Sequence, residues 1–563
     1  MNRTDPDIVL LPAPRQFNRL AGVSVAPVEE QLDPTIARRQ GYRLSITPQF
    51  SRLIGHDPAG LFYGRQTLAQ LRRQFPRQLP CLEIEDWPDF PVRGVMLDIS
   101  RDKVPTMATL FPLVDQLSQW KVNHLQLYIE HTFAYRGHEQ VWQNASPMTG
   151  DEIRELREFC RSRFVELVPN QNSFGHMERW LKHPRYLRLA ESPNGADTPW
   201  GYRWNGPFSL CPTDPKSLDL LADLYAQLLP NFSANCFNVG CDETFDIGQG
   251  RSKAECDRRG MHEVYVDFLQ SVYELVAKHG RRMMFWGDII LKKPELIERL
   301  PKDVIALNWG YEADHPFDAE AEQFSRSGRE FYVCPGTSSW CSIAGRTDNM
   351  LTNQLAAAEA GLKHGAAGYL NTDWGDHGHL QYLPFGYPGL AAGAAMSWCL
   401  QSNRDLSLAR ALDVHTFSDS AGIIGSAICE LGNVYKSVGK PLKNRSALFS
   451  LLVPSSTHGD PMAGITLDGL EAARSAIQSA IRVIGSAKMN CPDAKLIQTE
   501  FTNAAAMLGY ACKIGHGEKR DTLGKELDQI IQSHRQCWLA RNRSGGLEES
   551  LENLSRQCRP GPV

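Results

Sequence analysis

Eight short apolar runs alternate with longer amphipathic runs between residues 93 and 370, and this alternation limits the possible folds most strongly. The runs predict β-strands at 93–99, 123–129, 164–168, 235–239, 282–286, 303–307, 330–334 and 366–370. Helical patterns separate most of them, and the clearest begins at Thr149, which has the capping-box spacing to Glu152. Eight strands and helices in alternation predict an α/β fold, the closed (β/α)8 TIM barrel.

An open, doubly wound parallel sheet is the alternative fold for the same alternation. Such a sheet usually carries a glycine-rich phosphate loop after its first strand. Neither a GxGxxG pattern nor a Walker motif follows the run at 93–99, so the barrel is favoured. A barrel takes roughly 250 residues. The chain has 563 residues and must therefore contain further domains.

The segments that flank the predicted barrel have other patterns. Residues 1–88 predict a small α+β domain with a half-buried strand at 42–47 and a helix at 60–74. Residues 85–91 contain two prolines and predict a linker.

The barrel itself is expected over residues 89–400. Strand-like runs fade after residue 401, so residues 401–563 predict an α-helical C-terminal region. Two roles remain open for this region, completion of the barrel's site and a homodimer contact.

Charge and targeting signals narrow the classes of function. Lys plus Arg number 60 and Asp plus Glu 64, so the chain has no general electrostatic reason to bind nucleic acid or an anionic membrane. No apolar stretch approaches the roughly 18 residues that span a bilayer. The first residues lack a signal peptide and the 14 cysteines form no CxxC pair, which predicts a cytoplasmic protein with reduced thiols.

Polar and aromatic side chains follow every predicted strand at its C-terminal end, where a TIM barrel carries its active site. In strand order these are Arg101; Glu130; His176; Asp242 and Glu243; Trp286; Trp309 and Tyr311; Trp340; and Trp374 with Asp376. Scattered surface polarity would not repeat at eight strand ends. Tryptophan faces pack on the C–H faces of sugars, and Asp, Glu and Arg bind hydroxyl groups. The set therefore predicts a carbohydrate site.

Several motifs agree with this prediction. They are RGVMLDISR at 93–101, FGH at 174–176, GCDE at 240–243, the two tryptophans Trp286 and Trp309, Trp374-Gly-Asp376, and GLFYGRQTLAQL at 60–71. Through them the chain resembles the family 20 glycoside hydrolases, the β-N-acetylhexosaminidases, and looks most like the hexosaminidase D-type branch. The resemblance covers roughly residues 40–400 and leaves the helical C-terminal region unexplained.

The resemblance implies an exo-acting, retaining hydrolase of terminal GlcNAc or GalNAc. The substrate's own acetamido oxygen would be the nucleophile and an oxazolinium the intermediate, an exception to the two-carboxylate scheme. Glu243 would be the general acid and then the general base, and Asp242 would hold the acetamido N–H. Because adjacent carboxyl groups repel, we expect their pKa values to split, with that of Glu243 raised.

The other roles implied by the resemblance concern sugar binding. Arg101 would bind the hydroxyls of the terminal sugar, and Asp376 would do so from the opposite side, where the family usually has Glu. Trp286, Trp309 and Trp374 would form the aromatic walls.

Support for the general acid is also implied by the resemblance. His176 would hydrogen-bond to it, with Glu130 as the acidic partner of His176. No metal and no cofactor are implied.

Two positions depart from the family pattern. Cys241 stands where the family has Gly, which is tolerable if its side chain points away from the sugar. The family's strand 7 tyrosine, which hydrogen-bonds to the acetamido oxygen, has no counterpart, because strand 7 leads into GTSSW. Tyr311, Trp340 or a serine of that loop are the candidates for its place.

Two other functions fit the same residues. The first is a double-displacement glycosidase with Glu243 as acid and Asp376 or Glu130 as nucleophile. The second is a sugar-binding barrel without turnover, against which the Asp-Glu pair argues. The run Asp376-His377-Gly-His379 suggests a zinc site, but no further ligand matches it in sequence, so no metal is predicted.

Overall fold

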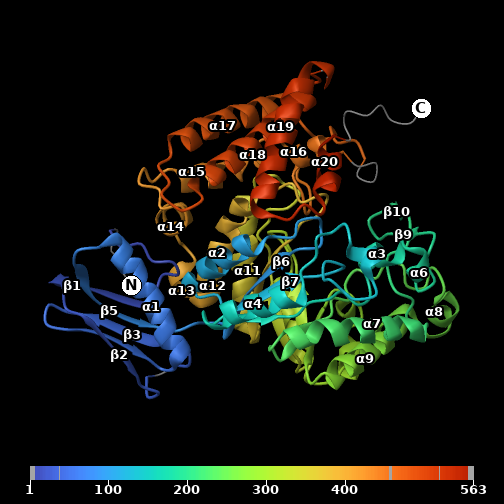
Figure 1. Ribbon diagram of the computed structural model, residues 1–563, viewed down its shortest axis with the longest axis horizontal. Helices are drawn as coiled ribbons and strands as arrows, with labels where there is room; N and C mark the ends of the chain where they lie inside the picture. The colour runs from blue at the N-terminus through green and yellow to red at the C-terminus, as the bar shows by residue number, and fades with distance from the viewer. Residues whose placement is uncertain (1–6, 37, 455–458, 519, 556–563) are drawn as a thin grey trace.

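The computed structural model describes residues 7–36, 38–454, 459–518 and 520–555. Figure 1 shows a barrel, a small β-rich domain beside it, and a group of helices packed across one end. The barrel has eight parallel strands in the order β11-β12-β13-β14-β15-β6-β7-β8. A parallel bridge between Asn170 and Asn238 joins the two outer strands and closes the barrel. The (β/α)8 barrel predicted from the sequence is confirmed.

Each predicted strand is present within a few residues of its expected bounds. The strands are β6 (Val92–Asp98), β7 (His124–Tyr128), β8 (Glu166–Val168), β11 (Cys236–Asn238), β12 (Arg282–Trp286), β13 (Ile305–Trp309), β14 (Glu330–Cys334) and β15 (Gly368–Asp373). Most of their residues are buried, because helices cover the outside and side chains fill the inside.

Seven longer helices cover the strands from outside. They are α2 (Met107–Gln119), α4 (Gly150–Arg161), α7 (Pro215–Leu228), α9 (Met261–Lys278), α10 (Phe317–Arg326), α11 (Thr347–His364) and α12 (Tyr387–Trp398). The capping box predicted for α4 is formed, since Thr149 accepts from the backbone of Glu152 and Glu152 from that of Thr149. Between β12 and β13 the chain has two short 3-10 helices instead, η2 (Ile290–Lys292) and η3 (Pro294–Arg299).

The N-terminal domain is a five-stranded sheet with one helix on it. Its strands are β1 (Gln16–Ser24), β5 (Leu79–Asp86), β3 (Tyr42–Ile46), β4 (Ser51–Gly55) and β2 (Val28–Leu32), in that spatial order, and its helix is α1 (Pro58–Gln74). The α+β prediction is confirmed.

The predicted linker at 85–91 begins too early, because β5 continues through Asp86. Asp86 is fully buried and accepts hydrogen bonds from Tyr42 Oη at 2.8 Å, Lys121 Nζ at 3.0 Å and Trp398 Nε1 at 2.9 Å. Since Lys121 and Trp398 belong to the barrel, this buried carboxylate fixes the domain to the barrel at the start of the predicted linker.

The C-terminal region is helical, as predicted. Its helices are α13 (Leu400–Asn403), α14 (Leu408–His415), α15 (Ile424–Leu431), α16 (Ala447–Leu452), α17 (Leu467–Ser486), α18 (Ala494–Gly515), α19 (Arg520–Arg541) and α20 (Leu547–Ser555). In the described part of the chain, none of the helices combines the length and apolar character that crossing a membrane demands.

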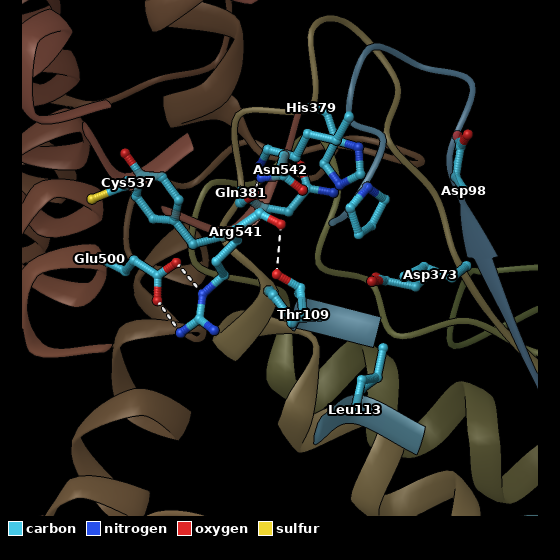
Figure 2. Close-up of a pocket in the computed structure, with 15 residues that line it drawn as sticks. Asp98, Thr109, Leu113, Asp373, His379, Gln381, Glu500, Cys537, Arg541 and Asn542 are labelled. Carbon is cyan, nitrogen blue, oxygen red and sulfur yellow. Dashed lines mark hydrogen bonds and ion pairs between the residues drawn. The ribbon is translucent and has the colours of Figure 1, made fainter. Parts of the chain in front are cut away.

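The C-terminal helices hold the loop that follows β6. The backbone of Arg543 donates to Val104, and Thr109 donates its hydroxyl to the carbonyl of Arg541 (Figure 2). Arg541 in turn is paired with the buried Glu500, at 2.6 Å from Nε to Oε1. Lys103, in the same loop, lies over the ring of Trp538 at 5.2 Å. The loop that carries Arg101 is thus clamped between the barrel and the helical region.

Candidate active site

A cavity of about 1240 Å³ lies at the C-terminal ends of the barrel strands. Barrel loops contribute Arg101, Glu130, His176, Glu243 and Asp376 to its lining. The C-terminal region contributes Lys440, Leu442, Lys443, Asn444 and Arg445. The C-terminal region therefore completes the wall of the cavity, which is the first of the two roles left open by the sequence.

The Asp242-Glu243 pair lies on a tight turn directly after β11. Gly240, Cys241 and Glu243 have backbone φ angles of 70°, 70° and 49°. A Cβ atom on Gly240 would lie 2.2 Å from Oδ1 of Asn172, so only glycine fits there. Non-glycine residues held at positive φ store strain, and such strain is concentrated at functional sites. Cys241 is fully buried, so its side chain points away from the cavity. This is the condition under which cysteine can stand where the family has glycine.

His176 contacts both members of the carboxylate pair. Its Nε2 lies 3.3 Å from Oδ2 of Asp242 and 3.4 Å from Oε2 of Glu243. Burial disfavours the charged ring, but Asp242 and then Glu243 outweigh it and raise the pKa of His176 well above its usual value. Arg101 Nη2 lies 3.2 Å from Nδ1 and, as a pure donor, favours the neutral ring. Within the described part of the chain Nε2 has no hydrogen-bond partner, so its contact with the two carboxylates is one of charge.

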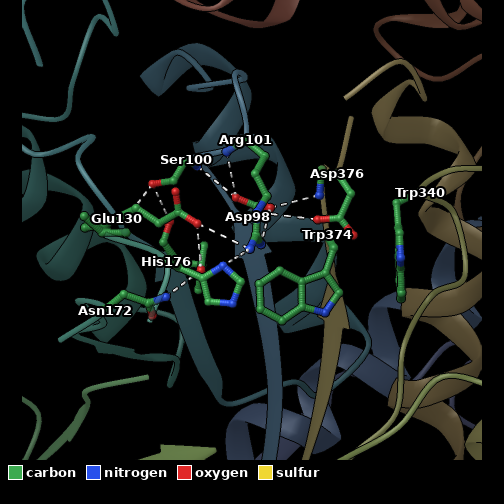
Figure 3. Close-up of polar contacts among 12 residues, drawn as sticks. Asp98, Ser100, Arg101, Glu130, Asn172, His176, Trp340, Trp374 and Asp376 are labelled. Atoms are coloured by element: carbon green, nitrogen blue, oxygen red, sulfur yellow. Dashed lines mark hydrogen bonds and ion pairs between the residues drawn. The ribbon is translucent and has the colours of Figure 1, made fainter. Parts of the chain in front are cut away.

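Arg101 is the centre of an ion-pair network (Figure 3). Its guanidinium lies 3.2 Å from Asp98, 3.3 Å from Glu130 and 3.4 Å from Asp376. It also packs over the ring of Trp374, 4.9 Å from the centroid. Burial raises the pKa of both Asp98 and Glu130, and the charge of Arg101 opposes that rise.

The contact expected between Glu130 and His176 is not formed. The guanidinium of Arg101 lies between the two side chains, 3.3 Å from Glu130 and 3.2 Å from His176. Glu130 accepts instead from Tyr128 Oη at 2.9 Å. Direct polar contacts thus link Glu130 to His176 through Arg101, an arrangement that the linear sequence could not indicate.

Four of the predicted aromatic residues form one cluster next to Arg101 and Glu243. Ring centroids are separated by 6.0 Å for Trp286 and Trp374, 5.3 Å for Trp309 and Tyr311, and 6.5 Å for Tyr311 and Trp374. Trp374 Nε1 donates to Tyr311 Oη at 2.8 Å, which fixes both rings.

Trp340 packs against this cluster, and its role in sugar binding stays a prediction. Its side chain is 1% exposed and packs edge-on against Tyr311, at 5.0 Å between ring centroids. Its Nε1 donates to Asn444 of the C-terminal region at 2.9 Å. Trp340 therefore supports Tyr311 and links the barrel to the helical region.

No role was predicted for Asp288, although it lies at the site. Its Oδ2 accepts from the backbone N–H of Glu243 at 3.2 Å, and its Oδ1 from Trp309 Nε1 at 3.4 Å. Burial, then the charges of Asp242 and Glu243, raise its pKa to about 7. Asp288 lies two residues after Trp286, at the C-terminal end of a strand, and this position could have identified it as a site residue from the sequence.

The residues of the suggested zinc motif do not converge. Asp376 faces Arg101, while His377 accepts from Arg445 at 3.1 Å through Nε2. His379 lines a separate small pocket, shown in Figure 2, with Asp98 and Gln381. Within the described ranges, no group of three His, Cys, Asp or Glu side chains could hold a metal ion.

Comparisons with known proteins agree with this geometry. The family model described as glycosyl hydrolase family 20, catalytic domain, matches residues 90–350, and the model for domain 2 of the same family matches residues 9–87. A beta-hexosaminidase of Akkermansia muciniphila is 25% identical over 309 residues, which are 50% of this chain and 61% of that protein. The match therefore spans less than two thirds of that relative.

Two further comparisons cover more of the other protein. Hexosaminidase D of Bos taurus is 25% identical over 344 residues, 55% of this chain and 91% of that protein. The solved structure of a chitobiase from Flavobacterium johnsoniae aligns with 95% of this chain and 100% of its own, at 15% identity and a TM-score of 0.59. At that identity the structural likeness is one of fold.

Proposed function

Because the chain belongs to glycosyl hydrolase family 20, we propose that it is an exo-acting, retaining β-N-acetylhexosaminidase that removes terminal GlcNAc or GalNAc by substrate-assisted catalysis. The observation that carries this proposal is the Asp242-Glu243 pair. Both carboxylates contact one histidine, and Glu243 lines the cavity. Oδ1 of Asp242 is buried and, among the described residues, has no hydrogen-bond donor. It is therefore suited to accept the acetamido N–H of a substrate.

The chemistry proposed for these residues has two steps. In the first, the acetamido oxygen attacks the anomeric carbon while Glu243 gives its proton to the leaving glycosidic oxygen. Asp242 stabilises the positive charge that develops on the acetamido nitrogen. In the second, Glu243 takes a proton from water, which attacks the same carbon and opens the oxazolinium. In this proposal Arg101 and Asp376, which pair with each other at 3.4 Å, bind the outer hydroxyls of the terminal sugar, and that role supports the exo mode.

The contacts of the two alternative nucleophiles argue against double displacement. Glu130 is 5% exposed, accepts from Tyr128 and pairs with Arg101. Asp376 is paired with the same guanidinium. A carboxylate committed to a buried arginine is stabilised in its ionised form and is a weakened nucleophile. Attack by the acetamido oxygen of the substrate requires neither Glu130 nor Asp376 as a nucleophile.

We further propose that Tyr311 takes the place of the missing strand 7 tyrosine. The serines of the GTSSW loop are buried and engaged, since Ser339 donates to Asp373 at 2.6 Å and Ser338 accepts from Asn349 at 2.9 Å. The Nε1 of Trp340 is engaged by Asn444 at 2.9 Å. The Tyr311 hydroxyl accepts from Trp374, so its proton is available to a substrate oxygen. Burial raises the pKa of Tyr311 well above its usual value and keeps that proton in place.

Replacing Tyr311 by phenylalanine tests this role. We expect kcat to fall by about 10²-fold, because Tyr311 would hold the attacking acetamido oxygen in position and misplacement of a reacting group costs roughly that much. Affinity for a thiazoline mimic of the oxazolinium should fall in parallel. Tyr273→Phe, which removes a hydroxyl bonded to Asp303 on the surface, is the matched control. An unchanged kcat in Tyr311→Phe contradicts the assignment.

The activity itself is tested with two chromogenic substrates in the presence of EDTA. We expect turnover of the β-N-acetylglucosaminide and the β-N-acetylgalactosaminide, and none of the β-glucoside, because only the first two carry the acetamido nucleophile. The measurement is kcat/KM for each substrate by release of the chromophore. Equal cleavage of glucoside and acetamido substrate would support double displacement instead, and binding without cleavage would support the sugar-binding role.

A further inference from the structure

The leaving group of the proposed reaction must lie on the side of the cavity where Glu243 stands, because Glu243 protonates the glycosidic oxygen. An aromatic wall starts at that point and runs outward. It consists of Phe208, Phe245, Trp200 and Tyr202, and Phe245 is only two residues beyond Glu243. Consecutive rings lie 4.5 Å, 5.6 Å and 5.9 Å apart. Tyr202 ends the wall, and Trp200 beside it is 50% exposed.

A basic segment from the C-terminal region lines the same cavity. It comprises residues 440–445 and carries Lys440, Lys443 and Arg445 but no acidic residue. Burial raises the pKa of Tyr202, the charge of Glu243 adds to the rise, and the charge of Arg445 opposes it. Tyr202, the last ring of the aromatic wall, thus lines the same cavity as the general acid and the basic segment.

Most other cationic groups of the cavity already have carboxylate partners. Arg101 is paired with Asp98 and Glu130, and Arg179 with Asp102 at 3.2 Å and Glu549 at 2.8 Å. The basic segment differs. Among the described residues, no carboxylate lies within ion-pair distance of Lys440, Lys443 or Arg445. Lys440 donates to a backbone carbonyl and Arg445 to His377.

We propose that the aglycone position of this site accepts an anionic sugar, a uronic acid or a sulfated hexose. Its ring lies on the aromatic wall and its negative group faces the basic segment. The inference rests on the proposed function and adds the class of the leaving group. Acidic residues also line the cavity. Asp376 and Glu130 are engaged by Arg101, and Asp102 and Glu549 by Arg179, which weakens their repulsion of a group placed at residues 440–445. Glu178 and Glu243 line the cavity as well, without a lysine or arginine partner among the described residues.

Three disaccharides test the inference. Each carries N-acetylglucosamine in β-1,4 linkage to a methyl glycoside of glucose, of glucuronic acid or of glucose 6-sulfate. We expect kcat/KM for an anionic substrate to exceed that for the glucose compound about three- to tenfold at low salt, the effect of one or two partly exposed ion pairs. The advantage should shrink between about 0.05 and 0.5 M NaCl, because salt screens such pairs. Which anion is preferred identifies the source of the charge.

Variants complete the test. Lys443→Gln and Arg445→Gln should each lower the anionic-to-neutral ratio, whereas Lys495→Gln, an exposed lysine of α18 away from the cavity, should leave it unchanged. Equal rates on all three disaccharides, or hydrolysis of the chromogenic substrate alone, would overturn the inference and leave the proposed function in place. Failure to cleave the chromogenic acetamido substrate as well would instead reject the proposed function.

Discussion

Replacing Glu243 by glutamine is expected to lower kcat/KM for a disaccharide substrate by about 10²- to 10⁴-fold, the usual contribution of general acid–base catalysis. Glutamine keeps the size of the side chain and its contact with His176, but it has no proton to give to the leaving oxygen. The measurement is the release of N-acetylglucosamine by the variant and by the unaltered protein, with Kd for the product measured alongside.

The matched control is Glu430→Gln, which changes an exposed glutamate of α15 in the same way. Its kcat/KM should equal that of the unaltered protein. Because the general acid matters most for a poor leaving group, the loss in Glu243→Gln should be smaller on an activated aryl glycoside. A variant that retains most of its turnover on the disaccharide would remove Glu243 from the catalytic role.

Replacing Arg101 by methionine should lower the free energy of unfolding by about 3–5 kcal/mol at pH 7, in addition to abolishing turnover. Arg101 pairs with three carboxylates, and the side chains of Asp98 and Glu130 are only 0% and 6% exposed. Methionine has a comparable length but no charge, so it leaves buried charges without a partner. Urea unfolding of the variant and the unaltered protein measures the difference.

The stability deficit of Arg101→Met should be smaller at pH 5 than at pH 7. Burial already raises the pKa of Asp98 and Glu130 with Arg101 present, and loss of the guanidinium raises both further. A group whose pKa is higher in the folded state binds its proton more tightly there, so its contribution to stability falls as pH rises through that pKa. Arg482→Met, at an exposed position of α17, is the control. Equal stability of the two variants would show that the network contributes nothing to folding.

The barrel could be predicted because its information is local. Each strand is a short apolar run buried on both faces, and each run is followed by an amphipathic helix, so the period of the pattern gives the element type. The rule that active sites lie at the C-terminal strand ends then selected Arg101, His176, Asp242 and Glu243 without coordinates. The cytoplasmic location and the homodimer stay predictions.

Contacts between distant segments could not be predicted in this way. Trp340 follows a strand end as the other tryptophans do, but its side chain packs against Tyr311 and bonds to Asn444. Glu130 and His176 both lie at strand ends, yet Arg101 stands between them. The amino-acid sequence shows which residues lie at the ends of strands. It does not show in which direction their side chains point.

The barrel, the flanking domains and the strand-end residues follow from the amino-acid sequence alone, because periodicity and motif spacing are properties of neighbouring residues. The packing of distant segments, in contrast, brings Asp288 to the backbone of Glu243 and residues 440–445 into the cavity wall. Those residues are 45 and about 200 positions from Glu243 along the chain. Their meeting depends on how the barrel closes and on where the C-terminal helices pack, and no local pattern encodes either.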